Sequence, residues 1–145
     1  ASYNVVEFKL QDFREIVEKY VDIVFANEEE ARAYTGKNPE KALSILSDFC
    51  EIAVVKTGSE GSLIKRGDEI IKIGTIKVDL NDTTGAGDLY ASGFLYGYAM
   101  DYSLGKCGLF GSILAGNVIE EIGAKMADSR WDDIRKSIRN ISNEE

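Results

Sequence analysis

In the first half of the chain, segments with helical spacing of apolar residues alternate with short, uninterrupted apolar runs. The helical spacing predicts helices over residues 11–20, 27–35 and 38–49. The apolar runs at 22–26 and 52–56 are typical of strands buried in a sheet. Helices and strands that alternate in this way favour a parallel sheet covered by helices.

The second half of the chain begins with two short strand-like segments and continues with helical patterns. Residues 62–65 and 69–73 predict a hairpin with its turn at Gly67, and residues 75–79 predict a further strand. Three helices are then predicted, over residues 86–100, 104–122 and 129–141. We therefore predict an α/β fold, with a layered, mostly parallel sheet and flanking helices.

Composition excludes several classes of function. The chain has 145 residues and contains no histidine, which rules out a Ser-His-Asp triad or His-ligated zinc within it. It has only two cysteines, too few for a disulfide framework, so a cytoplasmic protein is the simplest expectation. A net charge of −8 opposes nucleic-acid binding, and no apolar run approaches the ~18 residues of a membrane span.

The segment Asp-Thr-Thr-Gly-Ala-Gly-Asp at 82–88 stands at the start of a predicted helix. Its glycines permit a tight turn, and peptide N–H groups at a helix N-terminus favour a bound anion. Asp88 would lie in the first turn, where a carboxylate could accept a hydroxyl proton while the N–H groups stabilise a transferring phosphoryl group. The simpler alternative is a turn followed by an aspartate that the helix dipole stabilises, and physics alone favours it. The spacing matches neither GxxxxGK[ST] nor GxGxxG.

Residues 82–88, followed by a helix of small residues, closely resemble the C-terminal motif of the PfkB (ribokinase-like) carbohydrate and nucleoside kinases. The resemblance extends from about residue 22 to residue 124. It implies that Asp88 is the catalytic base. It also implies an anion hole made of the peptide N–H groups of Gly85, Ala86 and Gly87. The activity implied is ATP- and Mg²⁺-dependent phosphorylation of a hydroxymethyl group on a sugar or nucleoside.

A second motif follows the first predicted strand. Asn27-Glu28-Glu29-Glu30 resembles the N-x-x-E motif of the family, which implies that Asn27 and Glu30 help to place Mg²⁺ and phosphates through water. Mg²⁺ prefers oxygen ligands and retains waters, so such a site is chemically reasonable. The alternative is a capping box, with Asn27 as the N-cap and Glu30 as its N3 partner. Both descriptions can hold together.

The remaining site residues also come from the resemblance. The segment after the second predicted strand resembles the T-x-G-x-x-G nucleotide-binding stretch, with lysine where the first threonine often stands; its candidate residues are Lys56, Thr57, Gly58, Ser59 and Gly61. The alternative is an ordinary strand–turn–strand connection. By resemblance, Ser112 would border the adenine, Gly123 would close the site, and Asp82 and Thr84 would contact a monovalent cation.

Small and aromatic residues of the two glycine-rich helices have a structural interpretation. Gly93 and Gly97 are four residues apart, a spacing that favours close packing of two helices. Four aromatic side chains are predicted to belong to the core and not to a base-stacking platform: Tyr90, Phe94, Tyr98 and Phe110.

Full-length relatives are about twice this size, and their acceptor pocket lies mainly in an N-terminal half with a di-glycine motif and a small β lid. Neither feature occurs here, so residues 1–145 are expected to be the C-terminal, nucleotide-binding and catalytic-base part, with the missing half as a partner. The edge or face that this half would cover invites self-association, so a homodimer is also considered. The alternatives are a hydroxymethylpyrimidine or pyridoxal kinase of the same fold, and a nucleotide-binding module without turnover.

Overall fold

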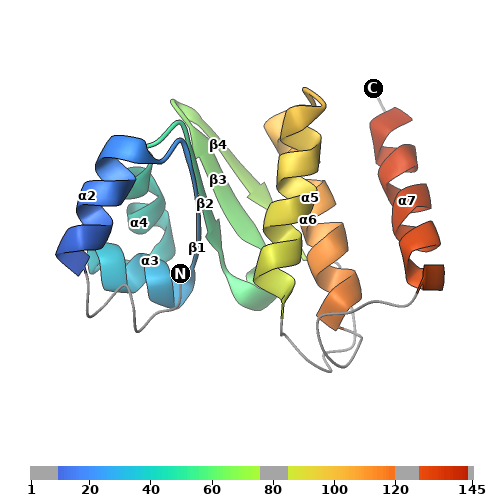
Figure 1. Ribbon diagram of the computed structural model, residues 1–145, viewed down its shortest axis with the longest axis horizontal. Coiled ribbons are helices and arrows are strands. Elements are labelled where there is room, and N and C mark those ends of the chain that lie inside the picture. Colours follow the sequence, from blue (N-terminus) through green and yellow to red (C-terminus); the bar gives the residue numbers. More distant parts are fainter. Residues whose placement is uncertain (1–9, 76–84, 120–127, 144–145) are drawn as a thin grey trace. The chain divides into compact units, whose positions relative to one another are not determined.

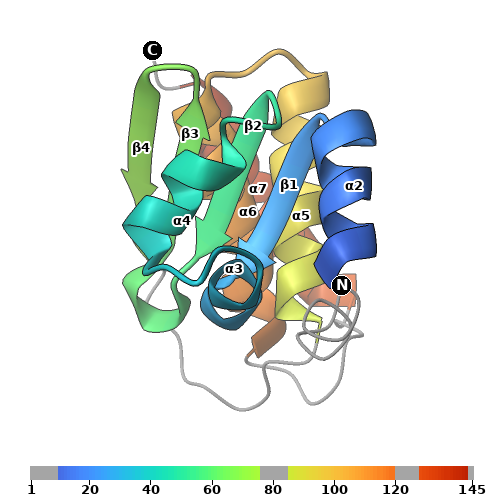
Figure 2. The same cartoon turned by 90° about the vertical axis from the view of Figure 1, so that its left-hand side faces the viewer.

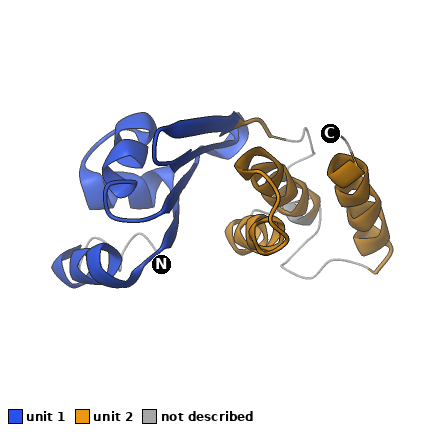
Figure 3. Ribbon diagram, turned by 90° about the horizontal axis from the view of Figure 1, so that it is seen from above, with its two compact units in different colours: residues 1–72 blue, residues 73–145 orange. Residues whose placement is uncertain are grey.

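The computed structural model describes residues 10–75, 85–119 and 128–143. The chain forms two compact units, Ala1–Lys72 and Ile73–Glu145 (Figure 3). Its elements in chain order (Figure 1) are α2 (Leu10–Tyr20), β1 (Ile23–Asn27), α3 (Glu28–Thr35), α4 (Pro39–Leu46), β2 (Ile52–Lys56), the 3₁₀ turn η1 (Gly58–Glu60), β3 (Ser62–Arg66), β4 (Glu69–Ile73), α5 (Ala86–Ala99), α6 (Leu104–Ile119) and α7 (Asp128–Asn143).

The four strands form one sheet in the order β1-β2-β3-β4 (Figure 2). β1 and β2 are parallel, with Ile23 opposite Ile52 and Asn27 opposite Lys56, which confirms the predicted parallel pair. β3 runs antiparallel to β2, with Ser62 opposite Lys56. The connection between them is too short for the crossover that a parallel pair requires, so the described sheet is mixed.

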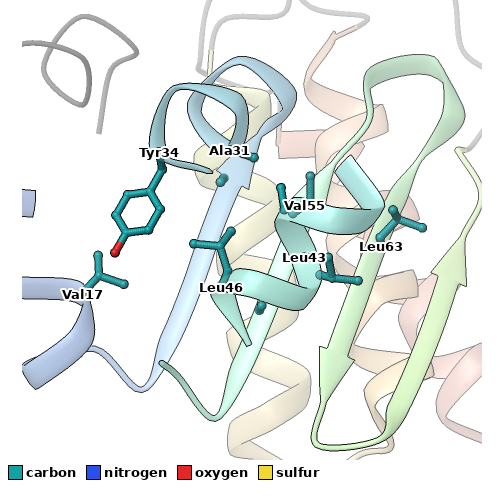
Figure 4. Packing of buried hydrophobic residues seen from close by; sticks show 10 residues of the cluster. Val17, Ala31, Tyr34, Leu43, Leu46, Val55 and Leu63 are labelled. Carbon is teal, nitrogen blue, oxygen red and sulfur yellow. The ribbon is translucent and has the colours of Figure 1, made fainter. Parts of the chain in front are cut away.

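The helices α2, α3 and α4 lie on one face of this sheet (Figure 2). Buried side chains from these helices pack against alternate residues of β2, such as Ala53 and Val55 (Figure 4). The central strand is buried on both faces, because Ile52 and Val54 are also 0% exposed. A strand buried on both faces reads as a continuous apolar run, which is why the sequence predicted it to the residue.

Helix ends follow local chemistry. α3 ends at Thr35 and is capped by Gly36, whose φ of 70° is left-handed, a conformation that glycine adopts without a steric cost. α4 begins at Pro39 and is capped by Asn38, whose side chain accepts a hydrogen bond from Lys41 N–H at 3.2 Å. α4 ends at Leu46, three residues before the predicted position. The chain tightens there, because Phe49 N–H donates to Leu46 C=O and forms a turn in place of an α-helical bond.

In the second unit, α5 packs against α6, and α6 against α7. Phe94 of α5 and Phe110 of α6 are both 0% exposed. A β-carbon on Gly93 would lie 2.5 Å from the carbonyl oxygen of Phe110, and one on Gly97 would lie 2.9 Å from the Phe110 ring. This confirms that the two glycines serve close packing of helices.

Two predictions extend beyond what the structure describes: residues 76–79 of the predicted strand and residues 120–122 of the predicted helix lie outside the described residues. Among the described helices, none combines the length and the apolar character that crossing a membrane requires.

Candidate active site

The carboxyl ends of β1 and β2 place two of the predicted segments next to each other. Asn27, the last residue of β1, is the register partner of Lys56, the last residue of β2. α3 begins directly after Asn27, and the loop from Thr57 to Gly61 begins directly after Lys56. In open α/β sheets, ligands bind outside the carboxyl ends of the strands. The first unit therefore brings the N-x-x-E segment and the glycine-containing loop to one edge of the sheet.

The Asn27–Glu30 segment forms a complete capping box. The Asn27 side-chain oxygen accepts a hydrogen bond from Glu30 N–H at 2.8 Å, and the Glu30 carboxylate accepts one from Asn27 N–H at 2.9 Å. The capping interpretation is therefore confirmed, and the proposed metal role stays a prediction. Over the described ranges, no cluster of three or more His, Cys, Asp or Glu side chains could hold a metal. The oxygens of Asn27 and Glu30 suit Mg²⁺, but the ion would draw its remaining ligands from water and phosphate.

The loop after β2 is a short, closed turn. Thr57 N–H donates to Gly61 C=O at 2.8 Å, and Gly61 N–H donates to Gly58 C=O at 3.1 Å. Gly58 and Gly61 have φ values of 53° and 100°, which favour glycine at both positions. Ser59 is exposed at the tip, whereas Thr57 is only 8% exposed. Ser59 is thus the more accessible of the two hydroxyl residues.

The N-terminus of α5 differs from those of α3 and α4, which asparagine side chains cap. Gly85 is the N-cap of α5 with a left-handed φ of 80°, and no side chain in the described residues caps this end. The first helical hydrogen bond runs from Leu89 N–H to Gly85 C=O at 3.0 Å. The N–H groups of residues 86–88 precede that bond and have no acceptor within the helix. This end of α5 therefore suits a bound anion, and the predicted anion hole stays a prediction.

Asp88 lies in the first turn of α5 and is exposed. Its backbone carbonyl accepts a hydrogen bond from the Ser92 hydroxyl at 2.8 Å, one turn later in the helix. An exposed carboxylate in a first helical turn can accept a proton from a hydroxyl group that approaches from solvent. The local geometry is thus compatible with the role that the resemblance implies for Asp88.

A contact that sequence reasoning missed supports the first turn of α5. Ala86 and Leu89 pack against a small core formed by Ile113 and Leu114 of α6 and Ile134 of α7. Ile134 is 2% exposed. The sequence predicted a helix over residues 129–141, but no pattern in it shows that this helix packs against the start of α5.

Ser112 lies on α6 and is 8% exposed. Its hydroxyl donates to the Gly74 carbonyl at 3.3 Å, a contact between residues 38 positions apart that the sequence does not reveal. Three of the four aromatic residues predicted to be core are buried, because Tyr90, Phe94 and Phe110 are at most 4% exposed. Tyr98 differs, at 37% exposed.

The predicted site residues thus divide between the two units. Asn27, Glu30 and the 56–61 loop belong to the first, and residues 85–88 and Ser112 belong to the second. Three further predicted residues lie outside the described residues: Asp82, Thr84 and Gly123.

Comparisons with known proteins agree with the motifs. Residues 3–130 match the family model of the pfkB family carbohydrate kinases. A nucleoside kinase of Methanocaldococcus jannaschii is 36% identical over 136 residues, which cover 90% of this chain and 43% of that protein. The crystal structure of adenosine kinase from Sinorhizobium meliloti is similar with a TM-score of 0.87 and 38% identity, over 94% of this chain and 42% of that one. A probable sugar kinase from Rhizobium etli matches with the same TM-score and 37% identity. The chain spans less than half the length of these relatives, and over that span it belongs to the pfkB family of carbohydrate kinases.

Proposed function

We propose that the protein carrying this chain is an ATP-dependent phosphotransferase that phosphorylates a hydroxymethyl group of a sugar or nucleoside. The observation that carries the proposal is the start of α5, where Asp88 lies in the first turn and no side chain of the described residues caps the helix N–H groups. Family membership supports it. Relatives named as nucleoside, cytidine and adenosine kinases support it further.

In this proposal the residues at the start of α5 carry out the phosphoryl transfer. Asp88 removes the proton from the attacking hydroxyl group. The N–H groups of Gly85, Ala86 and Gly87 stabilise negative charge on the phosphoryl group as it transfers. In such reactions most of the rate enhancement comes from positioning and electrostatic stabilisation, and these groups supply both.

The cofactors are ATP and Mg²⁺, and a monovalent cation near Asp82 and Thr84 is a further proposal. Mg²⁺ would neutralise charge on the phosphates when bound. Asn27 and Glu30 offer oxygens of the kind that Mg²⁺ prefers, beside the loop that we propose binds the nucleotide. That loop runs from Lys56 to Gly61, and its glycines allow the backbone to approach a ligand closely.

The acceptor pocket is proposed to lie mainly in sequence outside these 145 residues. The relatives named above are more than twice the length of the matched segment. Residues 1–145 would then be the nucleotide-binding and catalytic-base part. By themselves they should bind ATP weakly and show no acceptor-dependent turnover, because effective molarities of ~10⁵ M or more are lost when one reactant is not positioned.

The experiment compares two helix-start aspartates in the full-length protein. Asp88→Asn should lower kcat by ~10²–10⁴-fold, with KM for ATP unchanged, because it removes the general base and keeps the shape. Asp128→Asn is the matched control, since Asp128 is also an acidic residue in a first helical turn. ATP consumption is measured across panels of sugars and nucleosides.

A fall in kcat of less than about tenfold for Asp88→Asn, with circular dichroism unchanged, would contradict the proposed mechanism. Equal losses in the two variants would indicate a general effect on helix starts. Activity on neither panel would contradict the substrate class.

A further inference from the structure

β4 is the end strand of the described sheet. It pairs with β3 on one side, and no described strand flanks it on the other (Figure 2). The free edge of such a strand carries backbone N–H and C=O groups that can pair with a strand of another chain. β4 has five residues, of which three are isoleucines and none is a proline. It is therefore able to accept a further strand along its free edge.

Ile70 is the exposed apolar residue of this strand. It is 60% exposed, whereas Ile73 at the end of the strand is 6% exposed. Residues two positions apart on a strand share a face, so Lys72 lies on the same face as Ile70. Asp68, two positions before Ile70, lies in the hairpin turn where the strand begins. An acidic, an apolar and a basic residue thus follow one another along the exposed side of this edge.

The two charged residues of this row have no ion-pair partner of their own. In the part of the chain that the structure describes, neither Asp68 nor Lys72 forms a salt bridge. Glu69 differs, because its carboxylate lies 3.7 Å from the guanidinium of Arg66 on the same hairpin. Charged side chains on an edge strand oppose pairing with another strand unless opposite charges meet across the contact. The edge therefore accepts only a strand whose charges match Asp68 and Lys72.

A second copy of β4 supplies that match. Two copies related by a two-fold axis pair in an antiparallel manner, and opposite residues share a face, so each residue faces its own copy or a residue an even number of positions away. With Ile70 facing its own copy, Lys72 of each chain lies opposite Asp68 of the other. With Ile71 facing its own copy, Lys72 faces Ile70 and gains no opposite charge. A register centred on Glu69 or Lys72 sets two like charges against each other, which is destabilising.

We propose that the free edge of β4 is the docking surface for a second copy of this chain, with Ile70 on the two-fold axis and Lys72 paired with Asp68 on both sides of it. The same surface patch serves both copies, and the two sheets join into one. A contact through a five-residue strand is small, so the dimer should be weak, with a dissociation constant on the order of 10 µM. The inference does not depend on the proposed kinase activity.

The first test places a cysteine on the proposed axis in the full-length protein. In Ile70→Cys the two cysteines would face each other with Cα atoms about 4.5–5.5 Å apart, a range that a disulfide can span. Under mild oxidation we expect a disulfide-linked dimer on a non-reducing gel. Ile16→Cys is the matched control and should stay monomeric, because Ile16 is 50% exposed on α2, at the other side of the sheet (Figure 2). The unchanged protein measures any contribution of Cys50 and Cys107.

The second test exchanges the charges and measures the dissociation constant by sedimentation velocity. Lys72→Glu should raise it about five- to tenfold, because each new carboxylate faces Asp68 of the other chain. Lys72→Glu combined with Asp68→Lys should restore the original affinity, since the two charges are exchanged and the pairs re-form. Lys37→Glu is the control for the change in net charge and should dimerise normally, because Lys37 is exposed between α3 and α4.

A full-length protein that stays monomeric well above the expected dissociation constant would overturn the proposal. Disulfide formation in Ile70→Cys that is no faster than in Ile16→Cys would also overturn it. A dimer that Lys72→Glu leaves unchanged would show that the chains meet through another surface. Failure of the double variant to restore the affinity lost in Lys72→Glu would overturn the register centred on Ile70.

Discussion

Gly93 is the position where a single added carbon should test the packing of α5 on α6. A β-carbon there would lie 2.5 Å from the carbonyl oxygen of Phe110, 2.7 Å from its carbonyl carbon and 2.9 Å from the nitrogen of Gly111. Ordinary contacts begin at about 3.4 Å. Because all three atoms belong to the backbone of α6, Gly93→Ala should force the helices apart by about 0.9 Å.

Two opposing effects set the magnitude. Alanine favours a helix interior over glycine by ~1 kcal/mol. A gap of 0.5–1 Å forfeits roughly a quarter to a half of each dispersion contact, and strain from overpacking typically costs ~1–3 kcal/mol. The affected interface includes Phe110, which is 0% exposed and lies against both Gly93 and Gly97. We therefore expect Gly93→Ala to lower the free energy of unfolding by a net ~1–2 kcal/mol.

The assay is urea unfolding followed by far-UV circular dichroism, with Gly105→Ala as the control. Gly105 lies in α6, and a β-carbon there would meet no atom within 4 Å. That variant should be neutral or stabilised by up to ~1 kcal/mol. If Gly93→Ala raises the urea midpoint as Gly105→Ala does, the close contact between the helices is refuted.

Three further predictions concern other parts of the molecule. In the full-length protein, Glu30→Gln should raise the Mg²⁺ concentration needed for half-maximal activity, whereas the control Glu29→Gln should not. The stability of Glu30→Gln should change little, because glutamine also closes a capping box. An unchanged Mg²⁺ titration would leave Glu30 only its capping role. Ile134→Ala should lower the free energy of unfolding by ~2–5 kcal/mol in urea, because Ile134 is 2% exposed in the core beneath α5; a loss below ~1 kcal/mol would contradict that packing. Burial raises the pKa of Tyr34 above its ordinary value of 10.0, so the unfolded chain loses the phenol proton first and stability should fall as pH rises past about 10. Urea titrations at several pH values should show a smaller fall for Tyr34→Phe, and identical slopes would count against a buried phenol.

Elements whose signals are local could be predicted from the sequence. The strand at 52–56 was predicted to the residue, because a continuous apolar run gives it a clear pattern. The capping box at Asn27 and the turn at Gly67 follow from residue types that favour those conformations. The end of α4 was placed too late, since the apolar spacing continues to Phe49 after the α-helical hydrogen bonds give way to tighter ones.

Features that depend on residues far apart in the chain could not be predicted. The hydroxyl of Ser112 reaches the carbonyl of Gly74, and Arg14 bonds to the carbonyl of Tyr34, but neither pair has a signature in the sequence. The motif at 82–88 predicted a helix start, and α5 begins at Ala86 with Gly85 as its N-cap, whereas anion binding there stays a prediction. The contact between α7 and the start of α5 joins residues that are far apart in the chain, so the sequence alone does not show it.

The contact of α7 with the first turn of α5 has a consequence for biosynthesis. Ile134 leaves the ribosome 48 residues after Ala86, which it helps to cover. At a translation rate of about 5–20 residues per second, several seconds pass between the synthesis of Ala86 and that of Ile134. Ile113 and Leu114 are synthesised 21 and 20 residues before Ile134, so in the last part of this interval they lack their α7 partner and present apolar surface. Translation that stalls between α6 and α7 should therefore yield chains that chaperones bind through this exposed surface.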